Sequence, residues 1–133
     1  MSSKQRIGII GAGWWAAAMH IPTLVSNSSA EIAGICATDT DALKKVQDEF
    51  GISYGVTDYR QLLSEVDLDG VIISSPHTFH FEHAKAALEA GCHVLVEKPF
   101  TTDSKEAKEL IDLAAKKNLN LNVSHGWNYM PIA

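Results

Sequence analysis

The sequence has little of what marks secreted, membrane-spanning or nucleic-acid-binding proteins. Its only two cysteines, Cys36 and Cys92, lie far apart in apolar surroundings, so we expect buried free thiols in a reducing cytoplasm and no disulfide framework. No run of about 18 apolar residues is present to cross a membrane. Lysine and arginine never occur in runs longer than two, and the net charge is −5. We therefore expect a cytoplasmic protein with no membrane and no nucleic-acid partner.

What the sequence does contain is a regular alternation of short apolar runs and longer helical patterns. The 133 residues are 46% hydrophobic, which is enough for one domain that folds without a metal or a disulfide. Strands are expected at residues 6–10, 31–36, 53–56, 71–74, 93–96 and 119–123, and helices at 14–20, 40–50, 58–65, 78–90 and from 103 onward. We expect Pro22 to restrict or end the first helix.

This alternation predicts the α/β class with a doubly wound parallel sheet. The expected strands are apolar throughout, as in a parallel sheet covered by helices on both faces. Residues 126–133 form an apolar stretch after the last expected strand, with no element left to pack on. We therefore expect 1–125 to form the nucleotide-binding domain and 126–133 to begin a truncated C-terminal α/β domain whose remainder is absent from this chain.

The segment from Gly11 to Ala16 has the G-x-G-x-x-A form of a dinucleotide-binding loop. It lies between an expected strand and an expected helix. Gly11 permits a tight turn, Gly13 lets the backbone approach a pyrophosphate, and Ala16 lets the helix pack close to the strand. The candidate cofactor-binding residues here are Gly11, Ala12, Gly13, Trp14 and Trp15.

The end of the second expected strand carries information about the type of cofactor. NAD-binding proteins usually place an acidic residue there to bind the ribose 2′-hydroxyl, but this sequence has Ala37 followed by Thr38. Small neutral residues leave room for a 2′-phosphate, so the cofactor is NAD or NADP with a lean toward NADP. Asp39 is the alternative ribose ligand if the register slips by two, and otherwise a cap or turn residue before Thr40.

The segment Ser74-Ser75-Pro76-His77 leaves the fourth expected strand beside the first, where the nicotinamide half of a dinucleotide should lie. His77, His80 and His83 follow at three-residue spacing. On a helix this spacing turns the three side chains away from one another, and no cysteine or carboxylate cluster completes a shell. We therefore expect no metal site, and a core role for His83.

Glu97-Lys98-Pro99 leaves the fifth expected strand. The pair Glu97 and Lys98 is compatible with a solvated turn. It also lies on the ligand side of the predicted sheet, where a lysine can hydrogen-bond a substrate hydroxyl and where burial can lower a lysine pKa.

Taken together, these motifs resemble one family, the glucose–fructose oxidoreductase / inositol dehydrogenase / MocA family (Gfo/Idh/MocA). The resemblance extends from about Arg6 to Pro131, and its most specific part is Glu-Lys-Pro after Gly-x-His-Val. The motifs that carry it are Gly11-Ala12-Gly13, His20-Ile21-Pro22, the run from Ser75 to His80, the run from Ala87 to Val94, and Glu97-Lys98-Pro99.

The resemblance implies roles for individual residues. Lys98 matches the catalytic lysine that contacts substrate and helps proton transfer, and Glu97 matches a residue near the nicotinamide. Ser75, Pro76 and His80 match the loop that lines the cofactor. Two positions depart from the pattern: His77 stands where the family often has Asn, and Cys92 replaces a common Lys.

The resemblance also implies a function. The expected function is that of an NAD(P)-dependent oxidoreductase acting on a sugar, polyol or related small molecule. The full-length protein is expected to form a homo-oligomer through the C-terminal domain that is absent from this chain. The isolated nucleotide-binding domain is expected to be inactive. The alternatives are a non-catalytic NAD(P)-binding regulator of the same family and, from another class, an S-adenosylmethionine methyltransferase, in which Glu97-Lys98-Pro99 has no place.

Overall fold

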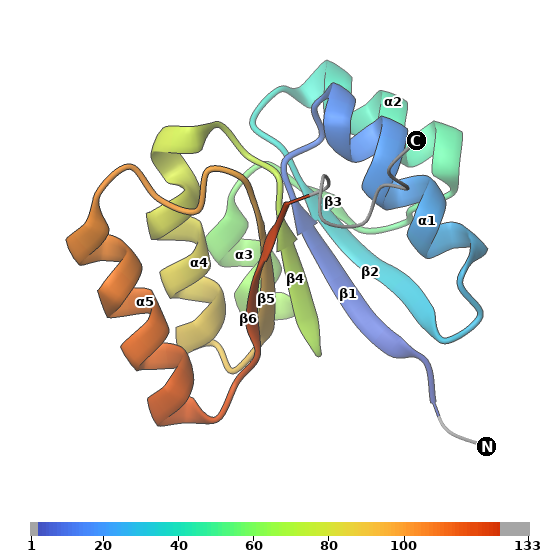
Figure 1. Cartoon of the computed structure of the whole chain (residues 1–133). Coiled ribbons are helices and arrows are strands. Elements are labelled where there is room, and N and C mark those ends of the chain that lie inside the picture. Colours follow the sequence, from blue (N-terminus) through green and yellow to red (C-terminus); the bar gives the residue numbers. More distant parts are fainter. Residues whose placement is uncertain (1–2, 126–133) are drawn as a thin grey trace, which may run out of the picture.

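The computed structural model describes residues 3–125, which form a six-stranded parallel sheet covered by helices (Figure 1). The strand order is β3-β2-β1-β4-β5-β6, and it reverses beside β1. The stretch 126–133, where a second domain was predicted to begin, lies outside the described residues. The strands are β1 (Gln5–Ile10), β2 (Ala30–Cys36), β3 (Gly55–Val56), β4 (Gly70–Ile73), β5 (His93–Glu97) and β6 (Leu121–Ser124).

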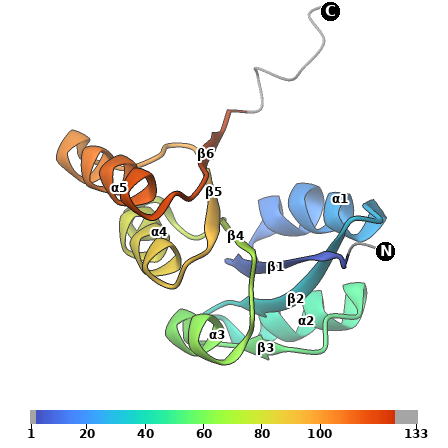
Figure 2. The same ribbon diagram turned by 90° about the horizontal axis from the view of Figure 1, so that it is seen from below.

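Helices cover both faces of the sheet. Figure 2 shows α1 and α2 on one face and α3, α4 and α5 on the other, as right-handed crossovers require when the strand order reverses. The helices are α1 (Ile21–Ser26), α2 (Thr40–Phe50), α3 (Tyr59–Glu65), α4 (His80–Glu89) and α5 (Ser104–Lys117), with a π-helical turn η1 (Ala16–His20) before α1 and a 3₁₀ turn η2 (His77–Phe79) before α4. Within residues 3–125, none of these helices combines the length and apolar character needed to cross a membrane.

The strands are apolar on both faces because each face has its own core. Alternate strand residues point to opposite sides of a sheet, so neighbours such as Ile9 and Ile10 enter different clusters. Ile9 and Ile35 pack with Ile21 of α1 and Leu43 of α2. The opposite cluster joins strand residues to α3, α4 and α5 and includes Ile10, Ile73, Val96, Leu62, Leu88 and Leu110. The predicted doubly wound sheet is confirmed.

Helix ends also follow the sequence signals. Asp39, Asp58 and Asp103 are the N-caps of α2, α3 and α5, and each carboxylate accepts a backbone N–H bond from the first turn of its helix. Gly51 ends α2 with φ 69°, in the left-handed region where glycine avoids the steric cost of a Cβ. The three aspartates therefore mark where loops at the carboxyl edge of the sheet end and the helices begin.

Pro22 was expected to restrict or end the first helix, and the structure shows that it does not end it. The chain is helical from Trp14 to Ser26, and only the type of helix changes. In the π-turn the N–H of Ile21 donates to the carbonyl of Ala16, five residues earlier. Pro22 lacks an N–H and stands in the first turn of α1, where a missing donor is tolerated. The proline therefore marks the return from π to α geometry.

Candidate cofactor site

A hollow of about 720 Å³ opens at the carboxyl ends of the strands. It lies where the strand order reverses between β1 and β4, which is where open α/β sheets bind ligands. Its volume is within the range of small-molecule and cofactor sites. Its walls come from the four loops that follow β1, β2, β3 and β4: residues 11–15, 36–39, 57–60 and 74–77.

The two glycines of the loop after β1 are explained by different structural requirements. Gly11 has φ 110°, and a Cβ built on it would lie 2.5 Å from the backbone carbonyl of Ser74. Its N–H donates to the carbonyl of Cys36 over 2.8 Å. Gly11 is therefore required by the packing of the protein itself.

Gly13, in contrast, faces open space. A Cβ built there would meet no atom within 4 Å, so nothing within the described chain requires a glycine at this position. The residue lines the hollow immediately before the first helical turn, where free N–H groups and the helix dipole favour a negative charge. The open space beside these N–H groups is compatible with the predicted pyrophosphate position.

The end of β2 provides no carboxylate at the position where ribose is usually bound. Ala37 is buried and its N–H donates to the carbonyl of Val56, while Thr38 beside it is exposed. Asp39 has the capping role: its Oδ1 accepts from the N–H groups of Asp41 and Ala42 at 2.9 and 3.1 Å.

Arg60 is a wall residue that the sequence analysis did not select. Among the described residues that line the hollow it is the one lysine or arginine. Its guanidinium lies 4.6 Å from the centre of the Tyr59 ring and within 3.7 Å of carboxylate oxygens of Asp58 and Glu82. No local sequence motif marks Arg60 as a residue of a binding site.

The three histidines of the α4 region do not converge on one point. His77 is exposed on the wall of the hollow, whereas His80 has no exposed surface. His83 is buried, as expected, and its Nδ1 lies 2.8 Å from Oγ of Ser75. Burial lowers the pKa of His83 from its ordinary value. Among residues 3–125, no group of three His, Cys, Asp or Glu side chains is arranged to hold a metal ion.

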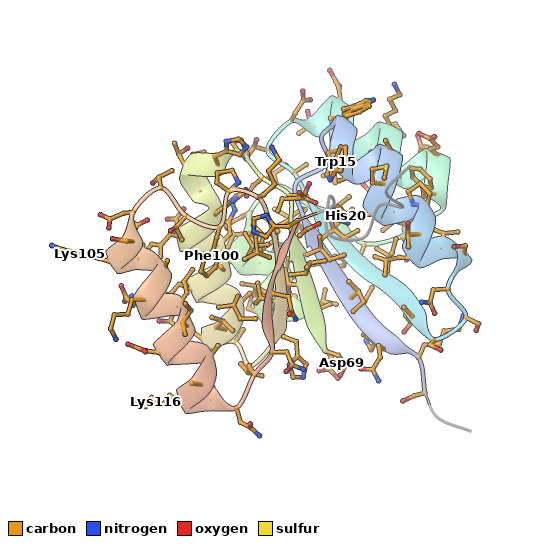
Figure 3. All side chains as sticks on the ribbon, viewed as in Figure 1. Trp15, His20, Asp69, Phe100, Lys105 and Lys116 are labelled. Carbon is orange, nitrogen blue, oxygen red and sulfur yellow. The ribbon has the colours of Figure 1, made fainter. Side chains whose placement is uncertain are left out.

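Glu97 at the end of β5 is bound by two residues from the first helix. Its Oε1 accepts from the indole Nε1 of Trp15 over 2.8 Å and lies 2.5 Å from Nε2 of His20. Glu97 is only 9% exposed. Figure 3 shows Trp15 and His20 at the same end of the sheet, opposite to Asp69, which precedes β4. The carboxylate therefore ties the loop after β5 to the helix that follows the glycine loop.

The π-turn explains how Trp15 and His20 reach one oxygen. In an α-helix, residues five apart point about 140° away from each other. In a π-turn, the residue five positions later lies one turn above, so Trp15 and His20 share a face. The sequence analysis used His20 only for the resemblance and did not predict this contact.

Lys98 directly follows Glu97 and is exposed. The Lys98–Pro99 peptide is cis. The part of the chain that the structure describes leaves the lysine side chain exposed to solvent. Ser75 and Pro76, the other expected cofactor residues on this side, lie on the wall of the hollow.

Comparison with known families accounts for this arrangement. Residues 5–125 match the family Gfo/Idh/MocA, described as "Oxidoreductase family, NAD-binding Rossmann fold". The chain belongs to this family. The match covers nearly all of the described residues, including the glycine loop, the end of β2 and Glu97-Lys98-Pro99. It confirms the resemblance seen in the sequence.

Gfo/Idh/MocA relatives of known activity include D-glucoside 3-dehydrogenase of Escherichia coli (strain K12), which is 35% identical over 115 residues, covering 86% of this chain and 33% of the relative. The dTDP-3,4-didehydro-2,6-dideoxy-alpha-D-glucose 3-reductase of Saccharopolyspora spinosa is 31% identical over 125 residues, covering 94% of this chain and 37% of the relative. The chain thus spans about a third of the length of these relatives.

Solved structures show the same nucleotide-binding fold. The 3-ketoreductase from Actinomadura kijaniata in complex with NADP matches with a TM-score of 0.90 and 32% identity, over 97% of this chain and 41% of that one. The scyllo-inositol dehydrogenase from Lactobacillus casei with bound NAD(H) and scyllo-inositol matches with a TM-score of 0.89 and 25% identity, over 96% of this chain and 38% of that one. The family therefore contains both NADP and NAD(H) complexes.

Proposed function

We propose that this chain is the nucleotide-binding part of an NAD(P)-dependent oxidoreductase that acts on a sugar, a polyol or a related small molecule. The observation that carries the proposal is the open space above Gly13 at the head of the first helix, inside the hollow where the strand order reverses. The relatives named above are dehydrogenases and reductases of sugar-like compounds, which supports the same class of reaction for the protein to which this chain belongs.

The bound nicotinamide would supply the hydride chemistry, and the protein would supply binding, orientation and proton transfer. Gly11, Ala12 and Gly13 would hold the pyrophosphate with backbone N–H groups at the start of the helix, beside Trp14 and Trp15. Ala37 and Thr38 would border the adenosine ribose. Ser75 and Pro76 would line the nicotinamide side.

Glu97 and Lys98 would work at the reacting end. Glu97 is fixed through Oε1 by Trp15 and His20, which positions the residue that follows it. Lys98 would contact the substrate oxygen. It would take part in removing the proton of the substrate hydroxyl when the carbon that carries this hydroxyl loses a hydride. The exposure of Lys98 leaves its ammonium accessible to a substrate held between this domain and a second one.

We also propose a preference for NADP(H) over NAD(H), which the end of β2 supports. No carboxylate stands at Ala37 to bind two ribose hydroxyls, and the carboxylate of Asp39 is engaged at the start of α2. A 2′-phosphate would not be repelled by Ala37, and Thr38 has a hydroxyl to donate to it. We further propose a cytoplasmic, homo-oligomeric full-length protein that binds neither nucleic acid nor membrane.

Cofactor binding tests the proposal directly. Titration of the chain with NADPH and NADH should give saturable binding and a rise in melting temperature, because a ligand that binds only the folded state stabilises it. The variant Gly13→Val should lose this binding while its own melting temperature stays close to that of the parent, since a Cβ there would meet no protein atom within 4 Å.

Gly70→Ala is the matched control, because Gly70 lies at the opposite edge of the sheet, where a Cβ would make only ordinary contacts. It should bind the cofactor as the parent does. Normal binding by Gly13→Val would show that the hollow is not the cofactor site. Stabilisation by S-adenosylmethionine in place of either dinucleotide would favour the methyltransferase alternative.

A further inference from the structure

His80 is a buried residue that contacts the loops after β4 and β5. It is the first residue of α4 and has no exposed surface. Its Nε2 is 2.8 Å from the carbonyl oxygen of Ser75, and its Nδ1 is 2.8 Å from the carbonyl oxygen of Pro99. Ser75 follows β4 and Pro99 follows β5, so one imidazole spans the two loops.

This bridge begins where the sheet stops. The pairing of β4 with β5 ends at Ile73 and Val96, and both loops continue beyond that pair without ladder hydrogen bonds between them in the described chain. The Ser75 carbonyl and the Pro99 carbonyl are therefore connected by His80 in place of the sheet. Lys98 lies immediately before Pro99, so the bridge fixes one side of the proposed catalytic residue.

The two partners of His80 determine which protons it carries. A carbonyl oxygen accepts hydrogen bonds and cannot donate them, and a neutral imidazole has only one N–H. Two hydrogen bonds to two carbonyls therefore require a proton on each ring nitrogen. A neutral ring would leave one nitrogen lone pair facing an oxygen lone pair at 2.8 Å in a buried position, which is unfavourable.

We propose that His80 is a doubly protonated imidazolium that joins the loops after β4 and β5 and so positions Lys98, acting through the backbone of Pro99 and not by contact with the cofactor. The proposal rests on the proposed function only for the consequence at Lys98. The protonation and the bridge follow from the geometry alone.

The surroundings contain opposing contributions. Burial of the ring and the amino terminus of α4 both disfavour a positive charge on His80. The His77 ring centre lies 5.6 Å from that of His80, and His83 follows one turn further along α4. His83 has a lowered pKa, chiefly because of burial, so it adds little positive charge. Two charge-assisted hydrogen bonds, each roughly twice as strong as a neutral one, act in the other direction.

The protonation is measured without any cofactor. In the chain labelled with ¹⁵N-histidine, both ring nitrogens of His80 should carry a proton and should show slow hydrogen exchange. The signals are assigned by their loss in His80→Gln. A non-protonated ring nitrogen for His80 would overturn the proposal.

Binding and turnover test the positioning role. His80→Gln keeps two N–H donors on one nitrogen without the charge, whereas His80→Leu keeps none. In the full-length enzyme, kcat should fall by about tenfold or more in His80→Leu, equivalent to one strong hydrogen bond, and should recover in part in His80→Gln, with a smaller change in cofactor Kd. His93→Leu, at the opposite edge of the sheet, is the control and should change neither quantity.

The outcomes separate the two proposals. If Gly13→Val loses cofactor while both His80 variants keep the parental kcat, the positioning role is wrong and the proposed function stands. If Gly13→Val binds cofactor normally, the proposed function is wrong, and the ¹⁵N measurement still decides the state of His80.

Discussion

The two parts of the proposed site, the glycine loop and Glu97-Lys98-Pro99, are built in different ways. At the glycine loop, the shape comes from the backbone and from missing side chains: Gly11 is packed against the Ser74 carbonyl, and Gly13 leaves its space open. At the Glu97-Lys98-Pro99 end, the shape comes from side chains that reach across the molecule. Trp15 and His20 hold Glu97 from 82 and 77 residues away in sequence, and His80 holds the Pro99 carbonyl.

This difference suggests how each end tolerates change. A backbone site fails when a side chain is added, because the added atoms fill space that the fold or the ligand needs. A side-chain site fails when a group is removed, because its buried partner then lacks a hydrogen bond. Substitutions at the two ends should therefore affect different measurable quantities.

The largest effect is expected at the side-chain end. In the full-length protein, Lys98→Ala should lower kcat by at least about a hundredfold, because loss of a group that transfers a proton typically costs about 10²–10⁴ in rate. Cofactor Kd should stay within a few fold, since the pyrophosphate end does not involve Lys98. Near-parental kcat would assign Glu97-Lys98-Pro99 to a structural turn, as would be expected of a non-catalytic regulator.

The two glycines should separate folding from binding at the backbone end. Gly11→Ala should destabilise the chain by about 2 kcal/mol or more, because its positive φ and its contact with Ser74 both oppose a Cβ. Gly13→Ala should change the free energy of unfolding by less than about 0.5 kcal/mol, as expected where no contact is made or lost. Urea unfolding of both variants measures this difference, and equal destabilisation would contradict it.

Cofactor choice should respond to one residue at the end of β2. Ala37→Asp introduces a carboxylate that accepts from ribose hydroxyls and repels a 2′-phosphate, so the ratio of the NADH and NADPH Kd values should move toward NADH by about tenfold or more, equivalent to about 1.4 kcal/mol. Parallel titrations give the ratio, with Thr40→Asp as a control for added charge nearby. Tighter NADH binding by the parent chain would instead favour Asp39 as the ribose ligand.

The smallest effect is expected for one of the two donors to Glu97. Trp15→Phe removes the indole N–H but leaves His20 in place, so we expect a loss of about 0.5–1.5 kcal/mol in the free energy of unfolding. Trp14→Phe is the matched control, because Trp14 is 77% exposed. Equal losses in the two variants would mean that the bond to Glu97 contributes nothing measurable.

The features that could be predicted from the sequence are those determined by residues close together along the chain. The alternating pattern predicted the doubly wound sheet. The glycine loop and the possible capping role of Asp39 were recognisable because the residues that explain them lie within a few positions in the sequence. The contact of Glu97 with Trp15 and His20 was not predictable in this way. It depends on a π-turn, and no short-range pattern in the sequence distinguishes five residues per turn from the usual helix.

The π-turn between Trp15 and Ile21 also has a consequence for comparing this chain with its relatives. An α-helix that gains one residue without losing its flanking contacts can absorb it as a single turn of π-helix. Removal of the exposed Ala18 would place the tryptophan and the histidine four positions apart, which is again one face of an ordinary α-helix. We therefore expect the contact with Glu97 to be kept at either helix length. Relatives in which the first helix is one residue shorter are expected to align correctly only with a gap inside that helix, and an ungapped alignment would pair His20 with the wrong residue.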